Sequence, residues 1–145
     1  LKGDAKRGKA QIQRCFICHK VAGQGIDFGP DLSHWGQPRA IEEIIEAMVH
    51  PAAKLAPGFD TPMRIRDRGH VAEGMYSNYA KHGPGSQYGG SLSLKVFGGQ
   101  THKIFFSHNN PKIEVLKKHS WMPPASKQGL SDQDIRDIAQ YLKTL

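Results

Sequence analysis

Two cysteines and a histidine lie within five consecutive residues near the N-terminus, where Cys15 and Cys18 are followed directly by His19. The 145-residue chain has no other cysteine. A disulfide across two intervening residues would close too small a loop to stabilise a fold. The Cys-x-x-Cys-His pattern is typical of covalent haem attachment, in which two thiols add to the two vinyl groups and the imidazole binds the iron. We therefore expect thioether bonds at both cysteines and His19 as an axial ligand of one haem c.

Two other kinds of site use a Cys-x-x-Cys pair. A zinc site needs further ligands and would have to recruit distant histidines such as His102 and His108, whose spacing fits no familiar zinc finger. A thioredoxin-like redox pair lies between a strand and a helix of a βαβ unit, whereas here a helix is expected before Cys15. Both alternatives are less favoured than haem attachment.

Three segments have apolar residues at helical spacing. Residues 4–14 are expected to form a basic amphipathic helix that leads into the haem motif. Residues 39–50 form a second amphipathic pattern, which Pro51 ends. Ser131 and Asp134 form a Ser-x-x-Asp capping pattern for a last helix with an apolar stripe. These helices are expected to surround and position the motif.

The segment between the second and the last expected helix has a different character. Residues 52–118 lose helical periodicity, gain glycines and contain short alternating runs around residues 63–65, 92–96 and 104–106. Gly98 and Gly99 indicate a hairpin turn. We interpret residues 61–118 as a β-rich insertion, a small hairpin or sheet that either covers one edge of the haem or docks a partner.

Composition favours one globular domain, residues 1–145. No apolar run approaches the roughly 18–20 residues that a membrane-spanning helix needs, so no membrane span is expected. The net charge is +7, and the first 20 residues are strongly basic, with Lys2, Lys6, Arg7, Lys9, Arg14 and Lys20 against Asp4 alone. This cluster could be a solvated face or could steer the protein toward an acidic partner. No nucleic-acid-binding signature accompanies the charge, so no nucleic acid is expected.

The order of these features resembles the class I cytochromes c. A helix, Cys-x-x-Cys-His, Gly29-Pro30-Asp31-Leu32, Met122-Pro123 and a closing helix follow one another as they do in that family. The resemblance implies a mainly α cytochrome c fold, with helices around one haem c and the small β insertion before the distal methionine loop. It also implies that the Pro30 carbonyl accepts a hydrogen bond from His19, that Met122 is the distal ligand, and that the terminal helices cross closely at Gly8.

A finer resemblance points to one subclass. Residues 29–36, 44–51, 120–124 and 130–135 are similar to the haem-binding domain common in planctomycete and related bacterial proteins, which often ends a larger dehydrogenase-like chain. The sequence departs from that pattern at Ile12, where an aromatic residue is usual, and residues 78–90 match nothing in it. Helix packing should tolerate the first departure, whereas the second leaves the partner open.

Several residues compete for the second axial position. Met122 lies in a proline-flanked loop directly before the last helix, where the chain can hold it against the iron. Met48 lies on an apolar helix face, and Met63 and Met75 lie in the alternating segment, where methionine usually fills gaps in a core. His119, three residues before Met122, would give bis-histidine coordination instead. We favour Met122.

Two further residues are candidates for haem binding. The indole of Trp35 could donate a hydrogen bond to a haem propionate, and Arg39 is placed to neutralise one. The alternative is that Trp35 only packs and that Arg39 is a surface residue at a helix start.

The sequence therefore predicts a protein that transfers electrons through a six-coordinate haem with His19 and Met122 as axial ligands. It is not expected to be an enzyme, because such iron has no open position. The alternatives are a five-coordinate haem protein, either a gas sensor or peroxidase-like, and an electron-exit domain of a larger dehydrogenase. We expect a redox partner with an acidic docking surface and, because haem attachment occurs outside the cytoplasm in this family, a periplasmic or otherwise exported protein.

Overall fold

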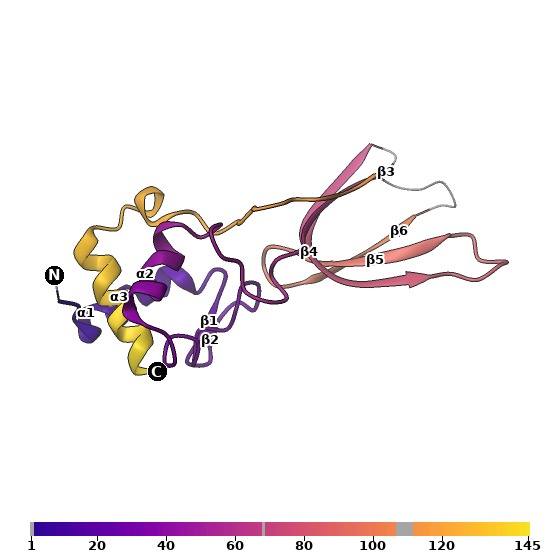
Figure 1. Cartoon of the computed structure of the whole chain (residues 1–145). Coiled ribbons are helices and arrows are strands. Elements are labelled where there is room, and N and C mark those ends of the chain that lie inside the picture. The colour runs from indigo at the N-terminus through magenta and orange to yellow at the C-terminus, as the bar shows by residue number, and fades with distance from the viewer. Residues whose placement is uncertain (1, 68, 107–111) are drawn as a thin grey trace. The chain divides into compact units, whose positions relative to one another are not determined.

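The chain folds into two compact units (Figure 1). The computed structural model describes residues 2–67, 69–106 and 112–145. One unit, here called the helical unit, consists of Leu1–Ala56 and Ser120–Leu145. The other, the sheet unit, is Pro57–His119. The sheet unit is thus inserted between two segments that fold together.

The helical unit contains the three predicted helices. Its elements are α1 (Ala5–Gln11), the 3-10 turn η1 (Ile12–Cys15), the two-residue strands β1 (Lys20–Val21) and β2 (Gln24–Gly25), α2 (Ile41–Val49), the 3-10 turn η2 (Ala125–Gln128) and α3 (Asp132–Thr144). Their core includes Ile12, Ile44, Met48, Ile138 and Leu142. None of the described helices is long and apolar enough to cross a membrane.

The N-terminal ends of α1 and α3 are defined by side-chain caps. Asp4 accepts hydrogen bonds from the amides of Lys6 and Arg7, which begins α1. α1 is shorter than the predicted 4–14, because the backbone tightens into η1 before it reaches the haem motif. α3 begins at the predicted cap, where Ser131 and Asp134 form a reciprocal capping box.

The sheet unit is a five-stranded antiparallel sheet with the order β6-β5-β4-β3-β7. Its strands are β3 (Pro62–Asp67), β4 (His70–Lys81), β5 (Gly90–Lys95), β6 (Thr101–Phe106) and β7 (Lys112–Val115). Four strands follow one another as a meander, and β7 returns to pair with β3. One face carries a core of its own, formed by Ile65, Leu92, Leu94 and Phe106.

The prediction of a mainly α fold with a small β insertion is wrong. Helix and strand account for 27% and 28% of the structure, and its largest regular element is the five-stranded sheet. The physical reason is that the alternating runs supply enough apolar residues on one face for a separate hydrophobic core. A hairpin resting on the helices would not need such a core.

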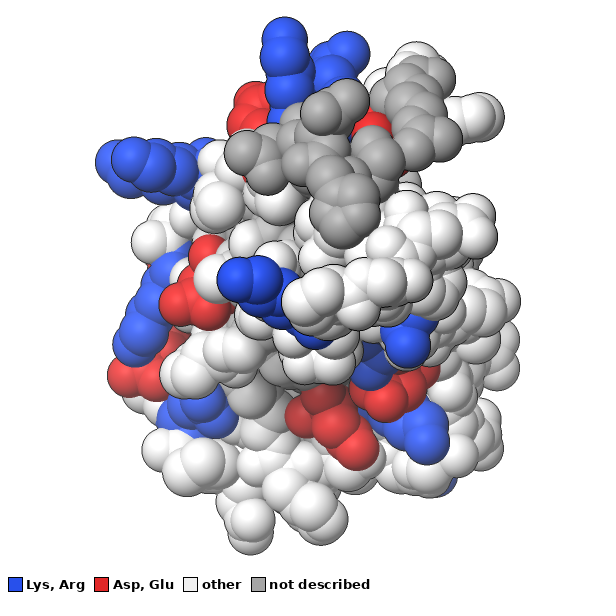
Figure 2. All heavy atoms as spheres, turned by 90° about the vertical axis from the view of Figure 1, so that its right-hand side faces the viewer, with Lys and Arg blue, Asp and Glu red and all other residues white. Residues whose placement is uncertain are grey.

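The positive charge is divided unevenly between the units. Residues 57–119 contain nine Lys and Arg against four Asp and Glu, whereas the remaining residues contain eleven against nine. In the view of Figure 2, Lys and Arg side chains are spread around the surface, with Asp and Glu beside several of them. The sheet unit therefore carries most of the net charge, although the basic N-terminal segment belongs to the helical unit.

α1 and α3 cross at very short distance. A Cβ built on Gly8 would overlap the Asp137 carbonyl group and lie 2.9 Å from the amide nitrogen of Ile138. Only glycine allows two helix backbones to approach this closely. The close crossing that the resemblance implies at Gly8 is present in the structure.

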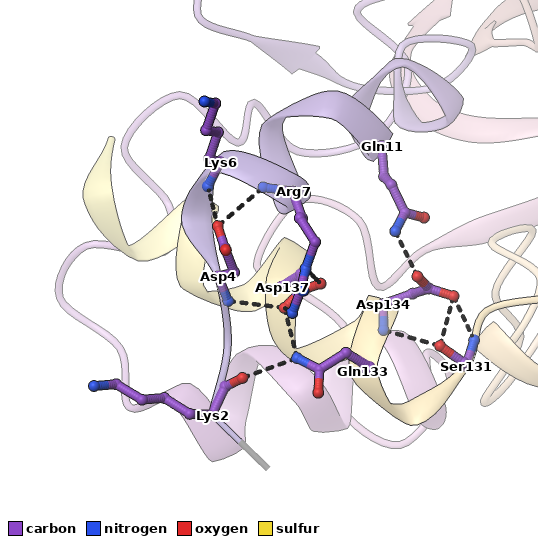
Figure 3. A network of polar contacts seen from close by, with 9 residues as sticks. All are labelled: Lys2, Asp4, Lys6, Arg7, Gln11, Ser131, Gln133, Asp134 and Asp137. Atoms are coloured by element: carbon purple, nitrogen blue, oxygen red, sulfur yellow. Dashed lines mark hydrogen bonds and ion pairs between the residues drawn. The ribbon is translucent and has the colours of Figure 1, made fainter.

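A polar network centred on Asp137 ties the start of α1 to α3 (Figure 3). The Asp137 side chain is only 1% exposed and accepts hydrogen bonds from the amide of Asp4, from the Arg7 guanidinium and from the Gln133 amide group. The hydrogen bond from Arg7 is the main reason that the pKa of Asp137 is lowered from its ordinary value. The network satisfies a carboxylate that would otherwise be buried without partners.

This network predicts acid-sensitive stability. Because the folded-state pKa of Asp137 lies below the ordinary value of 3.8, its ionised form stabilises the fold above that pH, and the contribution is lost as the pH falls through the folded-state pKa. Asp137→Asn should therefore lower the free energy of unfolding at pH 7 and lower it less at pH 3. Urea unfolding of the haem-loaded protein at the two pH values measures both.

The matched control is Asp132→Asn, which removes the same charge from an exposed position of the same helix. We expect it to have little effect at either pH. If both variants lowered the free energy of unfolding equally at pH 7, the loss would come from removing a negative charge from the helix and not from breaking the buried network.

Candidate haem-binding site

Cys15 and Cys18 lie in a tight turn at the end of η1. The amides of Cys18 and His19 both donate to the Cys15 carbonyl, at 3.1 and 2.8 Å. Both cysteine side chains are half-buried. Burial raises the pKa of each thiol, which is unlike the low-pKa thiolate of a thioredoxin-like redox pair. The turn thus presents two thiols and an imidazole from one short segment.

The imidazole of His19 is held in one tautomer. Its Nδ1 lies 2.7 Å from the carbonyl oxygen of Pro30. Because a carbonyl can only accept a hydrogen bond, Nδ1 carries the proton and Nε2 keeps its lone pair. Burial of the ring lowers the pKa of His19, although the hydrogen bond to Pro30 acts in the opposite direction. A neutral imidazole with Nε2 available is the form that binds iron.

The loop that carries Pro30 also fixes the plane of the His19 ring. The Gly29 amide donates to the Cys18 carbonyl at 2.6 Å. A Cβ built on Gly29 would lie 2.6 Å from Cε1 and 2.9 Å from Nδ1 of His19. Gly29 therefore lies flat against the imidazole, a role that we did not predict. The one sequence feature that could have indicated this role is the position of Gly29 directly before Pro30.

Met122 lies in the helical unit, half-buried against its core. Its amide donates to the hydroxyl of Ser120 at 3.2 Å. The neighbouring ring of Trp121 packs against Phe28, with centroids 5.9 Å apart. Because Phe28 directly precedes Gly29, this contact places the methionine loop beside the loop that holds His19.

The other candidates for the second axial position belong to different elements. Met48 is buried in α2 within the core of the helical unit. Met63 lies on β3 and Met75 on β4, both in the sheet unit. His119 is the last residue of the sheet unit. Apart from the buried Met48, Met122 is the only methionine in the unit that holds His19.

Trp35 and Arg39 contact each other. The Arg39 guanidinium lies 4.3 Å from the centre of the Trp35 ring and donates a hydrogen bond to the Trp35 carbonyl. Lys143, near the end of α3, donates to the carbonyls of Gln37 and Arg39. The two residues therefore form a stacked cation–aromatic pair fastened to α3, and a role for them at the haem propionates stays a prediction.

The residues of the helical unit fit a haem group. Two thiols, a neutral imidazole oriented by Pro30 and a thioether from an adjacent loop are the donors that haem c uses. In the described part of the chain, His, Cys, Asp and Glu side chains form no group of three or more that could hold a metal ion. No such group among the described residues includes Cys15 or Cys18, and His108 lies outside those residues.

Comparison with protein-family models matches residues 5–95 to the family described as Cytochrome c. The match covers more than half of the chain, begins with α1 and includes Cys15, Cys18, His19 and Pro30. It ends before the methionine loop. A search among curated proteins found no match.

The contact between Gly29 and His19 predicts that Gly29→Ala strains the imidazole. The added methyl group must displace the ring or the loop, because three ring atoms lie within 3.2 Å of the new Cβ. Overpacking of this kind costs about 1–3 kcal/mol. We expect a lower free energy of unfolding and a changed absorption spectrum of the haem-loaded protein.

Gly83→Ala is the matched control, since a Cβ at Gly83 would meet nothing within 4 Å. It should change neither quantity. A Gly29→Ala protein with wild-type stability and spectrum would contradict the close contact.

Proposed function

Because the chain belongs to the cytochrome c family, we propose that it transfers single electrons through one haem c with His19 and Met122 as axial ligands. Family membership gives covalently attached haem c as the cofactor and electron transport as the general function. Cys15 and Cys18 form the only Cys-x-x-Cys-His motif of the sequence. One haem, held by the helical unit, follows from that single motif.

The hydrogen bond between His19 and Pro30 is the observation that carries the proposal. It fixes the ring orientation and leaves the lone pair of His19 Nε2 available, so that Nε2 would bind the iron of the haem. A hydrogen-bonded imidazole is also a more basic ligand, so Pro30 would influence the reduction potential through His19. Bound in this way, haem supplies reversible one-electron chemistry at its iron.

Met122 is proposed as the second ligand because of its surroundings. The contact of Trp121 with Phe28 holds the Met122 loop beside the His19 loop. Pro123 and Pro124 restrict the backbone that follows, and the Gln128 side chain donates to the Pro123 carbonyl at 2.6 Å. A methionine braced on both sides can remain bound to iron in both oxidation states.

Two filled axial positions leave no site for a substrate at the iron, and for this reason we propose an electron carrier without enzymatic activity of its own. A five-coordinate gas-binding or peroxidase-like protein would need Met122 to be displaced. The same chemistry would serve an electron-exit domain of a larger dehydrogenase, and the resemblance to the planctomycete-type domain supports that arrangement. Export from the cytoplasm is part of the proposal, because haem attachment takes place outside the cytoplasm in this family.

Replacement of Met122 tests the ligand assignment. A thioether favours ferrous iron more than an imidazole does, so Met122→His should lower the reduction potential by on the order of 100 mV. Met122→Ala should open the site, so that the reduced protein binds carbon monoxide at neutral pH. The wild-type ferric protein should show the weak red absorption band of sulfur-to-iron charge transfer, and both variants should lose it.

Met63→Ala is the control, since Met63 is a half-buried methionine of the sheet unit. It should leave the potential and the charge-transfer band unchanged. Wild-type protein that binds carbon monoxide readily would favour the five-coordinate alternative. A ferric wild type without the band would refute a methionine ligand and make His119 the next residue to replace, whereas a band that survives in Met122→Ala would show that another methionine is the ligand.

The net positive charge predicts a salt-dependent association with an acidic redox partner. The net charge of +7 should accelerate encounters with a negatively charged electron-transfer protein, and ions screen this attraction. Between about 10 and 300 mM ionic strength, the second-order rate constant with such a protein should fall at least about tenfold. Stopped-flow absorption at the haem band measures it. A rate that does not change with ionic strength would show that the charge is only a solvated surface.

A further inference from the structure

The two faces of the sheet unit carry different side chains. Residues directly opposite each other on neighbouring strands point to the same face. The register therefore places Ile65 with the core residues, while its strand neighbours Arg64 and Arg66 point to the opposite face, here called the outer face. The outer face carries the charged residues Arg64 and Arg66 of β3, Glu73 of β4, and Lys112 and Glu114 of β7.

One row across the outer face pairs opposite charges. Arg64 on β3 stands opposite Glu73 on β4 and Glu114 on β7. Its guanidinium is 2.7 Å from the Glu73 carboxylate and 3.5 Å from that of Glu114. One cation thus lies between two anions, and each strand contributes to a favourable cross-strand interaction.

The next row, by contrast, brings two positive charges together. Arg66 on β3 stands opposite Lys112 on β7 and Val71 on β4. All three side chains are exposed, and Val71 is 54% exposed. Within the described residues, neither Arg66 nor Lys112 takes part in an ion pair. Like charges directly opposite each other in a sheet are destabilising, so this row costs stability in the isolated protein.

The basic N-terminal segment is different, because two of its six basic side chains are already engaged. Arg7 pairs with Asp137 at 2.9 Å. Arg14 donates to the Gln128 carbonyl. The helical unit as a whole contains almost as many acidic as basic residues. The N-terminal cluster is thus less available to a partner than the sequence suggests.

We propose that the outer face of the sheet unit, at Arg66, Lys112 and Val71, docks an acidic surface of a partner protein. This inference rests on the proposed electron-transfer function, for which it supplies the recognition site. Carboxylates of the partner would lie between the two cations and remove their repulsion. Arg66 offers a planar fork that can bind a carboxylate through two hydrogen bonds. Val71 would add an apolar contact to the same interface.

Arg66→Glu gives a test in which stability and binding move in opposite directions. The variant replaces a like-charged pair by an attractive Glu–Lys pair with Lys112, so its unfolding midpoint should be equal to or higher than that of the wild type. Its affinity for an acidic surface should nevertheless fall. The probe is poly-L-glutamate, titrated into the haem-loaded protein at low ionic strength, and we expect the affinity to drop about tenfold.

Lys6→Glu is the matched control, since it makes the same change of charge at an exposed residue of α1. It should weaken binding by less than about threefold. Lys112→Glu is a second test variant and should behave like Arg66→Glu. The proposal is overturned if Lys6→Glu weakens binding as much as Arg66→Glu, if Arg66→Glu binds as the wild type does, or if its binding loss comes with a lower unfolding midpoint.

The reduction potential of each variant separates this inference from the proposed function. Arg66→Glu should keep the sulfur-to-iron band and a potential close to that of the wild type. If the ferric wild-type protein lacked the sulfur-to-iron band, the assignment of Met122 as ligand would be contradicted. The poly-L-glutamate titration would still test the docking surface, because it does not depend on the axial ligand.

Discussion

The hydrogen bond from His19 Nδ1 to the Pro30 carbonyl is the constraint on which the rest of the site depends. It decides which ring nitrogen keeps its lone pair, and Gly29 restricts the plane in which that nitrogen can point. The loop that provides both groups is held by hydrogen bonds to the Cys18 carbonyl. Cofactor attachment and ligand orientation are therefore parts of one short hydrogen-bonded structure, which the helices need only support.

The helices provide that support through a single close crossing. Gly8 lets α1 approach the backbone of α3, and Asp137 secures the approach with buried hydrogen bonds. Because α1 runs directly into η1 and Cys15, any shift of α1 against α3 would also shift the haem motif. The polar network thus acts on the site from a distance, through the rigidity of one short helix.

Local features of the structure could be predicted from the sequence, whereas long-range pairings could not. The haem motif and the Ser131–Asp134 cap each depend on residues a few positions apart, so their spacing is sufficient. The sheet depends on the return of β7 to β3, about fifty residues earlier, and alternation alone does not specify a strand order. For the same reason, the opposition of Arg66 and Lys112 and the packing of Trp121 on Phe28 left no signal in the sequence.

The ends of the sheet unit meet, and this has a consequence for folding kinetics. The Leu116 amide donates to the Pro62 carbonyl at 2.8 Å, so a folded sheet unit brings the two ends of a long insertion together. α1 and α3 are otherwise distant in sequence, and the entropy of closing a flexible loop grows with its length. If the sheet unit folds first, its residues no longer count toward the flexible loop between α1 and α3. The loop that closes when α3 docks on α1 is then shorter by the length of the sheet unit. The insertion would then slow the assembly of the helices far less than its length implies.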